Sequence, residues 1–600
     1  MAPAFAPLPR REPSAHDSNA SLIRSSYARS LSRYSSLTSY TSPYPEKAGY
    51  SSGSLEDKYA LPPDPSRWGA NVSPDVREAD DDMHNPDVRS HRTNRDPFVL
   101  SSRGLANIGC LAFLCIGILT LFAGYPIISY FTRRQQETFG AFNLGGTNAS
   151  GQVPDISGKF GLIDPETPRE AYTKSAFTGS DSMELVFSDE FNTDGRTFYP
   201  GDDPYWEAVD LHYWQTNNLE WYDPAAITTK DGALTITLTQ KQTHGLDYQG
   251  GMMSSWNKFC FTGGYVETSV ILPGTTNIHG LWPAVWAMGN LGRAGYGASL
   301  HGMWPYTYDA CDVGTVANQT LNGLPEASTI NGDKSVGGVL SYLPGQRLSR
   351  CTCPGESHPG PVHKDGSYVG RAAPEIDLFE AQIDVPASAP AGSTTQAGEV
   401  SQSAQWAPFD AGYVWNNNSD NFILTDPTVS KLNTYLGGNT QQATSVVSDT
   451  DQQAYELTGK VYSIYGFEYR PGFDNAYITW ITNNKAAWTI KAAGVGANAA
   501  AEISARPIPQ EPLYLIMNLG MSKNFGVVQF DELTFPTSMY VDYIRVYQRA
   551  GEKNVGCDPD DFPTAKYIEQ YPEAYANPNF TTWDDDFGQT FPKNRFLGQC

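Results

Sequence analysis

The sequence predicts an all-β fold, a sandwich or jelly roll with long insertions, preceded by one membrane-spanning helix and a disordered tail. Three observations support this prediction. From residue 184 onward, short segments of alternating apolar and polar residues are separated by turn residues such as Asp231-Gly232. One long apolar stretch stands before them, and outside it no helical periodicity is sustained. The residues that precede this stretch contain few apolar runs.

The N-terminal part, residues 1–104, is predicted to be a disordered cytosolic tail. It is rich in Ser, Pro and Arg, and such a segment cannot bury enough apolar surface to offset the entropy lost on ordering. It contains 13 basic and 13 acidic residues, so the net charge of −24 belongs to the part of the chain beyond it.

The apolar stretch, residues 105–131, contains no charged residue and is long enough to span a bilayer. More than a hundred residues precede it, which disfavours a cleaved signal peptide. The arginines before it, from Arg89 to Arg103, outnumber Arg133 and Arg134 beyond it, which favours a cytosolic tail. The prediction is a single-pass type II protein of the secretory-pathway membrane (endoplasmic reticulum or Golgi) or the plasma membrane, with a lumenal or extracellular C-terminal part.

Composition divides the rest of the chain into three parts. These are a polar linker (132–180), a β domain (181–550) and a C-terminal extension (551–600). Two long insertions interrupt the strand pattern of the β domain. The first, residues 289–374, is rich in Gly, Pro, Tyr and Cys, and we expect disulfides to hold it. The second, about residues 386–456, is rich in Gln, Ser, Asn and Thr, and we expect it to wrap the binding cleft or the edge of the sandwich.

Cysteines and glycosylation motifs agree with a lumenal C-terminal part. An even number of cysteines follows the apolar stretch, which suits disulfides in an oxidising compartment, and the sequence leaves their pairing open. They are Cys260, Cys311, Cys351, Cys353, Cys557 and Cys600. Motifs for N-glycosylation beyond the stretch begin at Asn148, Asn318, Asn417 and Asn579.

Charge and cysteine spacing limit the possible ligands. Beyond the tail, 28 basic residues stand against 52 acidic ones, which argues against nucleic acid or an anionic polymer as a partner. A neutral polysaccharide is compatible with this charge. Cys351 and Cys353 with His358 and His363 are an alternative metal site, but a one-residue gap is shorter than usual zinc spacing, so no metal site is predicted.

Three carboxylates lie within one apolar, strand-like run, EIDLFE at residues 375–380. In a strand Glu375 and Asp377 share a face, and Glu380 joins them only if a β-bulge around Leu378-Phe379 absorbs one extra residue. Such crowding raises a carboxyl pKa and is costly unless it serves a purpose. Paired carboxyls that face one sugar ring are the machinery of glycoside hydrolysis. A solvated acidic strand and a cation site are the alternatives.

Upstream of this run, two tryptophans are candidate substrate-binding residues. Trp282, Ala284 and Trp286 fall on one strand face if residues 280–288 are extended. Indole faces at this spacing suit stacking on sugar rings, so we predict that Trp282 and Trp286 bind substrate. Packing in the core is the alternative interpretation.

The acidic run and its flanks resemble glycoside hydrolase family 16, β-jelly-roll enzymes that cleave or transfer β-glucans with retention. The flanks that carry the resemblance are residues 185–191, 231–238, 280–288, 465–471, 512–519 and 539–547. Further runs, at 304–306, 309–315, 351–355 and 373–377, are similar to the fungal membrane-anchored branch associated with β-1,6-glucan synthesis, the SKN1/KRE type. The resemblance covers roughly residues 181–600 and implies a concanavalin-like β-jelly roll.

The resemblance also implies roles. Glu375 is the expected nucleophile, Glu380 the acid/base, and Asp377 the carboxylate that orients the nucleophile. The implied function is a retaining glycosidase or transglycosylase that acts on β-glucan in fungal cell-wall β-1,6-glucan biosynthesis without a cofactor. Expected partners are β-glucan, the membrane and other secretory-pathway or wall-synthesis proteins. A noncatalytic glucan-binding scaffold, or a folding factor of the secretory pathway, is the alternative, which the intact trio of acids disfavours.

Overall fold

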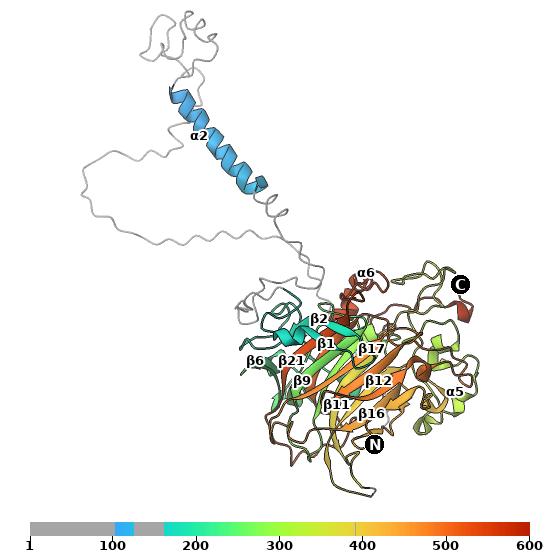
Figure 1. The fold of residues 1–600 in the computed structure, drawn as a ribbon. Helices are drawn as coiled ribbons and strands as arrows, with labels where there is room; N and C mark the ends of the chain where they lie inside the picture. The colour runs from blue at the N-terminus through green and yellow to red at the C-terminus, as the bar shows by residue number, and fades with distance from the viewer. Residues whose placement is uncertain (1–101, 125–160, 391) are drawn as a thin grey trace, which may run out of the picture. The chain divides into compact units, whose positions relative to one another are not determined.

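The structure, a computed structural model, describes residues 102–124 and 161–600, with the exception of residue 391 (Figure 1). Residues 1–101 of the predicted tail, the end of the predicted membrane span, most of the linker and the motif at Asn148 lie outside the described residues. The described residues fall into two units, a helical segment and a β domain, and each is described by itself.

The first unit contains one long apolar helix. α2 (Ser102–Leu119) continues into a short π-helical turn, η3 (Thr120–Gly124). Within them, Ala106–Gly124 has a mean hydropathy of 2.2 and is, by length and composition, able to cross a membrane. The predicted span, residues 105–131, is therefore helical as far as the structure describes it.

The second unit is a sandwich of two sheets, which confirms the predicted all-β fold (Figure 1). The site sheet, which carries the three carboxylates, contains in spatial order β3 (Glu207–Ala208), β8 (Leu246–Ser254), β20 (Leu513–Gly520), β10 (Trp282–Gly289), β11 (Glu375–Asp384), β12 (Ala397–Trp406) and β16 (Gln441–Asp449), with β14 (Ser430–Leu432) and β15 (Gly437–Gly438) on its edge.

The other sheet is called the back sheet. In spatial order it contains β1 (Thr173–Ser175), β2 (Ser182–Asp189), β21 (Thr537–Arg549), β9 (Gly264–Ile271), β17 (Ser463–Arg470), β18 (Tyr477–Thr482), β19 (Lys485–Lys491) and β13 (Phe422–Leu424), and β21 also pairs with β7 (Ala233–Thr243), next to β6 (Ile227–Lys230). β7 pairs further along with β8 and so links the two sheets. Two short strands, β4 (Leu211–His212) and β5 (Glu220–Tyr222), lie beside β8.

Helices of the β domain are short. They are α4 (Gly297–Leu300), α5 (Ala327–Ile330), α6 (Ala565–Gln570), α7 (Pro572–Ala576) and the 3-10 turns η4 (Arg169–Tyr172), η5 (Trp214–Thr216), η6 (Pro224–Ala226), η7 (Val313–Thr315), η8 (Ala317–Gln319), η9 (Lys334–Val336), η10 (Ala411–Tyr413), η11 (Ala492–Val495) and η12 (Arg595–Leu597). They lie in the loops, in the two insertions and in the C-terminal extension, and they do not interrupt the sheets.

Alternation of side chains along the strands divides the apolar residues into two layers. On β10, Val285 and Ala287 belong to the core between the sheets, together with Phe379 of β11 and Phe467 of β17. Trp286 points the other way, into a second cluster that also includes residues of the first insertion and of the C-terminal extension. These two segments therefore pack on the outer face of the site sheet.

Two parts of the β domain differ from the sequence prediction. β1 lies within the predicted linker, residues 132–180, and pairs with β2, so the β domain begins before residue 181. The second insertion, residues 386–456, does more than wrap the edge of the sandwich, because it supplies β12 and β16, which are neighbours within the site sheet. Their abundant Ser, Thr and Gln side chains obscure the apolar alternation that identifies a strand.

The cysteines of the β domain form three disulfides, as their even number predicts. The pairs are Cys260–Cys557, Cys311–Cys351 and Cys353–Cys600. Two of them fasten the C-terminal extension, and one closes a loop of the first insertion. Cys351 and Cys353 are bonded to other cysteines, so the alternative metal site with His358 and His363 is wrong. Within residues 102–124 and 161–600, no group of His, Cys, Asp and Glu side chains is placed to hold a metal ion.

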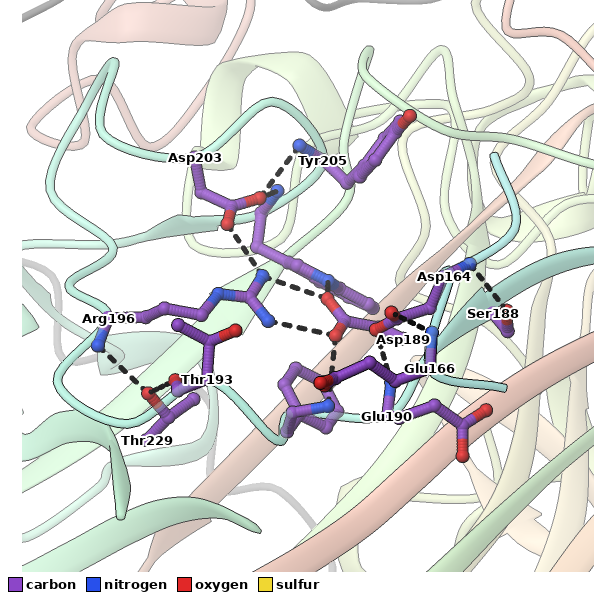
Figure 2. A network of polar contacts seen from close by, with 12 residues as sticks. Asp164, Glu166, Ser188, Asp189, Glu190, Thr193, Arg196, Asp203, Tyr205 and Thr229 are labelled. Atoms are coloured by element: carbon purple, nitrogen blue, oxygen red, sulfur yellow. Dashed lines mark hydrogen bonds and ion pairs between the residues drawn. The ribbon is translucent and has the colours of Figure 1, made fainter. Parts of the chain in front are cut away.

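A buried ionic network holds the first residues of the β domain, and Figure 2 shows two of its carboxylates directed at one guanidinium. Arg196 donates to both oxygens of Asp189, at 2.8 and 2.9 Å, and to Asp203 at 2.7 Å. Next to it, the backbone N–H of Asp164 donates to the hydroxyl of Ser188 on β2 at 2.9 Å. The network therefore joins the segment before β1 to the edge of the back sheet.

Candidate active site

A β-bulge brings the three carboxylates of β11 to one face. Against β10, Asp377 pairs with Trp286 and the next paired residue is Phe379, so Leu378 is the extra residue. Against β12 the register shifts in the same interval. The predicted bulge is confirmed, and it returns Glu380 to the face of Asp377.

This face is the outer face of the site sheet. Glu375, Asp377 and Glu380 stand opposite Met288, Trp286 and Ala284 of β10, in that order. On the other side, Gln405 and Ser401 of β12 stand opposite Glu375 and Glu380. Directly opposed residues share a face, so the acids lie between the β10 tryptophans and a row of small polar side chains.

Asp377 is the best hydrogen-bonded carboxylate of the trio. It is 2% exposed, and its Oδ2 accepts from the hydroxyl of Ser403 at 2.6 Å and from Nε2 of Gln405 at 3.1 Å. The indole N–H of Trp480, on β18, donates to its backbone oxygen at 2.8 Å. Burial raises the pKa of Asp377 to about 6, and the two side-chain hydrogen bonds limit the rise.

Glu380 accepts a hydrogen bond from the indole N–H of Trp282, 3.0 Å from its Oε1. Burial and then the charge of Asp377 raise the pKa of Glu380 to about 8, which the hydrogen bond from Trp282 opposes. A carboxyl with this pKa keeps its proton at neutral pH. That is the protonation state a general acid needs.

Glu375 accepts from the indole N–H of Trp304, 2.7 Å from its Oε2. Burial, followed by the charges of Asp377 and Glu380, raises its pKa well above the ordinary range, and the hydrogen bond from Trp304 acts in the opposite direction. Burial, followed by the charge of Glu375, raises the pKa of Tyr213 well above its ordinary value. The nucleophile candidate is therefore half-buried, with one indole donor directed at it.

The two tryptophans predicted to stack on sugars have different surroundings. Trp282 stacks on Phe525, with ring centroids 4.3 Å apart and planes 3° apart, so one face of its indole is covered. Trp286 is 9% exposed, and its N–H donates to Oδ1 of Asn518 at 2.8 Å. It offers a sugar little ring surface, and its surroundings match the alternative interpretation, packing. Substrate stacking on Trp282 stays a prediction.

Three glycosylation motifs lie within the described residues. Asn318, Asn417 and Asn579 are all exposed, as attachment of an oligosaccharide requires. Their modification stays a prediction.

The sequence missed several residues that contact the acids. Ser403 and Gln405 hold Asp377, and their spacing of two along a strand with Ser401 is the signal that could have revealed them. Trp304 and Tyr213 reach Glu375 from segments far along the chain. No local pattern predicts such long-range contacts.

Family comparison identifies the chain independently of the site. A family model described as "Beta-glucan synthesis-associated protein SKN1/KRE6/Sbg1" matches residues 70–600. The β-glucan synthesis-associated protein KRE6 of Saccharomyces cerevisiae is 40% identical over 536 residues, which cover 88% of this chain and 69% of that protein. KRE6 of Candida albicans is 37% identical and covers 92% of this chain and 73% of that protein.

Bacterial glucanases show more distant similarity. The endo-1,3-1,4-β-glycanase EglC of Rhizobium meliloti is 35% identical over 126 residues, 17% of this chain and 26% of that protein. Among solved structures, the laminarinase catalytic domain of Thermotoga maritima aligns with a TM-score of 0.33 and 18% identity, over 62% of this chain and 99% of that chain. On the family model and the fungal relatives, the chain belongs to the family of β-glucan synthesis-associated proteins SKN1/KRE6/Sbg1.

Proposed function

We propose that the β domain is a retaining glycosidase or transglycosylase that acts on β-glucan during assembly of fungal cell-wall β-1,6-glucan. The observation that carries the proposal is the placement of Glu375, Asp377 and Glu380 on one face of a bulged strand. Two carboxyls beside one sugar ring suffice for retaining chemistry. The names of the fungal relatives, which associate them with β-glucan synthesis, support the choice of polymer.

In the proposed mechanism, Glu380 donates its proton to the leaving glycosidic oxygen while Glu375 attacks the anomeric carbon. The bond from carbon to the leaving oxygen breaks, and a covalent glycosyl ester forms on Glu375. Glu380, now ionised, then takes a proton from an acceptor hydroxyl, which attacks the same carbon and releases Glu375. Water as acceptor gives hydrolysis, and a glucan hydroxyl gives transfer. No cofactor takes part.

The reactive state needs Glu380 protonated and Glu375 ionised. Burial raises the pKa of all three acids, and the charge of Asp377 adds to the rise for Glu375 and Glu380, so the three cannot all be charged near neutral pH, and they titrate as one unit. The N–H of Trp304 favours charge on Glu375. Asp377 is fixed by the hydrogen bonds from Ser403 and Gln405.

The proposal includes a location. A type II orientation, with the β domain in the lumen of the secretory pathway or outside the cell, agrees with the three disulfides and with the exposure of Asn318, Asn417 and Asn579. It also agrees with the candidate span, Ala106–Gly124. β-Glucan, the membrane and other proteins of wall synthesis are the proposed partners.

Product analysis tests the proposal. The full-length chain in detergent micelles is incubated with defined β-1,3- and β-1,6-gluco-oligosaccharides, and products are separated by chain length and linkage. We expect shortened or elongated products with the β configuration retained, and none from Glu375→Gln. Asp384→Asn, an exposed carboxyl at the end of the same strand, is the matched control and should behave as the wild type. Glucan binding by the wild type without any product supports the scaffold instead.

A further inference from the structure

Trp304 reaches the nucleophile candidate from the first insertion, outside the strands of the sandwich. Its indole N–H lies 2.7 Å from Oε2 of Glu375. The residue lies shortly after the end of α4, and its backbone N–H donates to the carbonyl oxygen of Leu300, the last residue of that helix, at 3.0 Å. The position of the indole therefore depends on the position of α4.

The C-terminal extension packs on α4. The backbone N–H of Ala298 donates to the carbonyl oxygen of Phe580 at 2.8 Å, and the backbone N–H of Trp583 donates to Nδ1 of His301 at 3.2 Å. The approach is close, because a Cβ on Gly297 would lie 2.6 Å from the carbonyl oxygen of Thr581. Residues near 580 are thus in direct contact with the helix that precedes Trp304.

Arg347 also holds α4 in place. It is 1% exposed, and its guanidinium donates to the carbonyl oxygens of Ala298, Ser299 and His301 at 2.8 to 3.0 Å. The guanidinium also lies 3.8 Å from the ring centroid of Trp583, which is 2% exposed. One buried cation therefore joins the end of α4 to the C-terminal extension.

From these contacts we infer that Trp304 is a positioning residue for the carboxylate of Glu375, and that Arg347 and Trp583 hold it in place. The C-terminal extension is then part of the active-site framework, although it contributes no group to the trio. The disulfide Cys353–Cys600 also joins the first insertion covalently to the end of the C-terminal extension. The inference rests on the proposed function, because it takes Glu375 as the nucleophile. It adds to that function the residues that position the carboxylate of Glu375.

Several titratable groups face Glu375. Asp377 and Glu380 lie on its own strand, and Tyr213 and Tyr514 approach it from other elements. None of these is a cation, and the indole N–H of Trp304 favours the ionised carboxylate. Removing it should make Glu375 harder to ionise.

The first test is the pH profile of kcat/KM for Trp304→Phe in the full-length chain, with an aryl β-gluco-oligosaccharide as donor. Phenylalanine keeps an aromatic ring and removes the N–H. We expect the acidic limb to move to higher pH by about one unit, because a hydrogen bond to a charged group is of that size. A purely structural role would lower kcat/KM at every pH and leave the limb in place.

Three further variants localise the effect. Trp583→Leu removes the ring that faces Arg347 and should move the limb in the same direction by less, whereas Trp583→Phe should restore the wild-type limb. Trp406→Phe is the matched control, because its buried N–H donates to the neutral hydroxyl of Thr444 at 2.9 Å. It should leave the limb unchanged. A wild-type limb in both Trp304→Phe and Trp583→Leu overturns the inference.

A second readout needs no turnover, so it separates this inference from the proposed function. Thermal unfolding is measured for Trp304→Phe, Glu375→Gln and the double variant across pH 5–9. If Trp304 stabilises the ionised carboxylate, Trp304→Phe lowers the melting temperature more as the pH rises, and this dependence disappears in the Glu375→Gln background. An effect of Trp304→Phe that is independent of pH in both backgrounds overturns the inference even if the enzyme is active.

Discussion

Each carboxyl of the trio has different hydrogen-bond partners, and their pKa values follow those partners. Asp377 accepts from two side chains and has a pKa of about 6, whereas Glu380 accepts from one indole and has a pKa of about 8. Asp377 is buried and Glu375 and Glu380 are half-buried on one face, where burial opposes ionisation. The two donors to Asp377 favour its charged form, which agrees with a lower pKa than that of Glu380.

The role of Glu380 can be tested by chemical rescue. Glu380→Ala should release an activated aryl leaving group, which needs little protonation, and then stall as the glycosyl ester on Glu375 because no base activates the acceptor. Azide needs no such base, so its addition should speed turnover and yield a β-glycosyl azide. Mass spectrometry of the product checks this. Absence of rescue, with the variant folded, contradicts the assignment of Glu380 as acid/base.

The raised pKa of Glu380 also predicts how stability depends on pH. Its ordinary value is 4.5, and its value in the folded chain is about 8, so the folded state binds more protons between these limits. Stability therefore falls as the pH rises through this window, and the penalty is full above pH 8. Glu380→Gln removes the penalty, so its gain in melting temperature over the wild type should grow from pH 4.5 to pH 8.

Melting temperatures measured by differential scanning calorimetry at closely spaced pH values check this dependence. Asp384→Asn is the control, because it removes an exposed carboxyl from the same strand, and its offset from the wild type should show no such growth. An offset of Glu380→Gln that is constant with pH contradicts a raised pKa at this position.

At the scale of secondary-structure elements, loops are tied to the sandwich by buried ion pairs. Arg196 joins Asp189 of β2 to Asp203 of the following loop, and the side chains of all three are at most 4% exposed. Arg196→Leu leaves two carboxylates buried without their cation, so it should destabilise the chain by about 3–5 kcal/mol. Urea unfolding of the full-length chain, monitored by tryptophan fluorescence, measures this change.

Two comparisons sharpen this test. Arg470→Leu removes an exposed pair, Arg470 with Glu552 at 3.9 Å, and should cost at most about 1 kcal/mol. Replacing both aspartates by asparagine in the Arg196→Leu background should recover part of the loss, because no buried charge then remains unpaired. Equal costs for Arg196→Leu and Arg470→Leu contradict this account.

The sequence predicted local elements better than the long-range contacts. The alternation of β10 and the bulge in β11 follow from residues within one strand, and both are confirmed. β12 was hidden because Ser401 and Ser403, on its outer face, are as polar as loop residues. Trp304 could not be assigned to Glu375, because 71 residues separate them and only the folded insertion brings them together.

At the scale of the whole molecule, disulfides distinguish the β domain from the apolar helix α2. Every cysteine of the β domain is in a disulfide, and Cys260–Cys557 joins positions 297 residues apart. Cys110 and Cys115, in α2, are the free cysteines among the described residues. This distribution suits a chain whose two sides meet different redox conditions.

Membrane orientation is therefore open to a direct test in microsomes that contain the full-length chain. If the β domain is lumenal, protease added from outside should remove the tail and leave a protected fragment that includes the three disulfides. The exposed asparagines Asn318, Asn417 and Asn579 should carry oligosaccharides, because glycosylation occurs on the lumenal side, so each Asn→Gln variant should lose the mass of one glycan. Detergent should make the fragment accessible to protease, which controls for intrinsic resistance. A protected tail with a digested, unglycosylated β domain reverses the orientation and removes the proposed access of the acids to wall glucan.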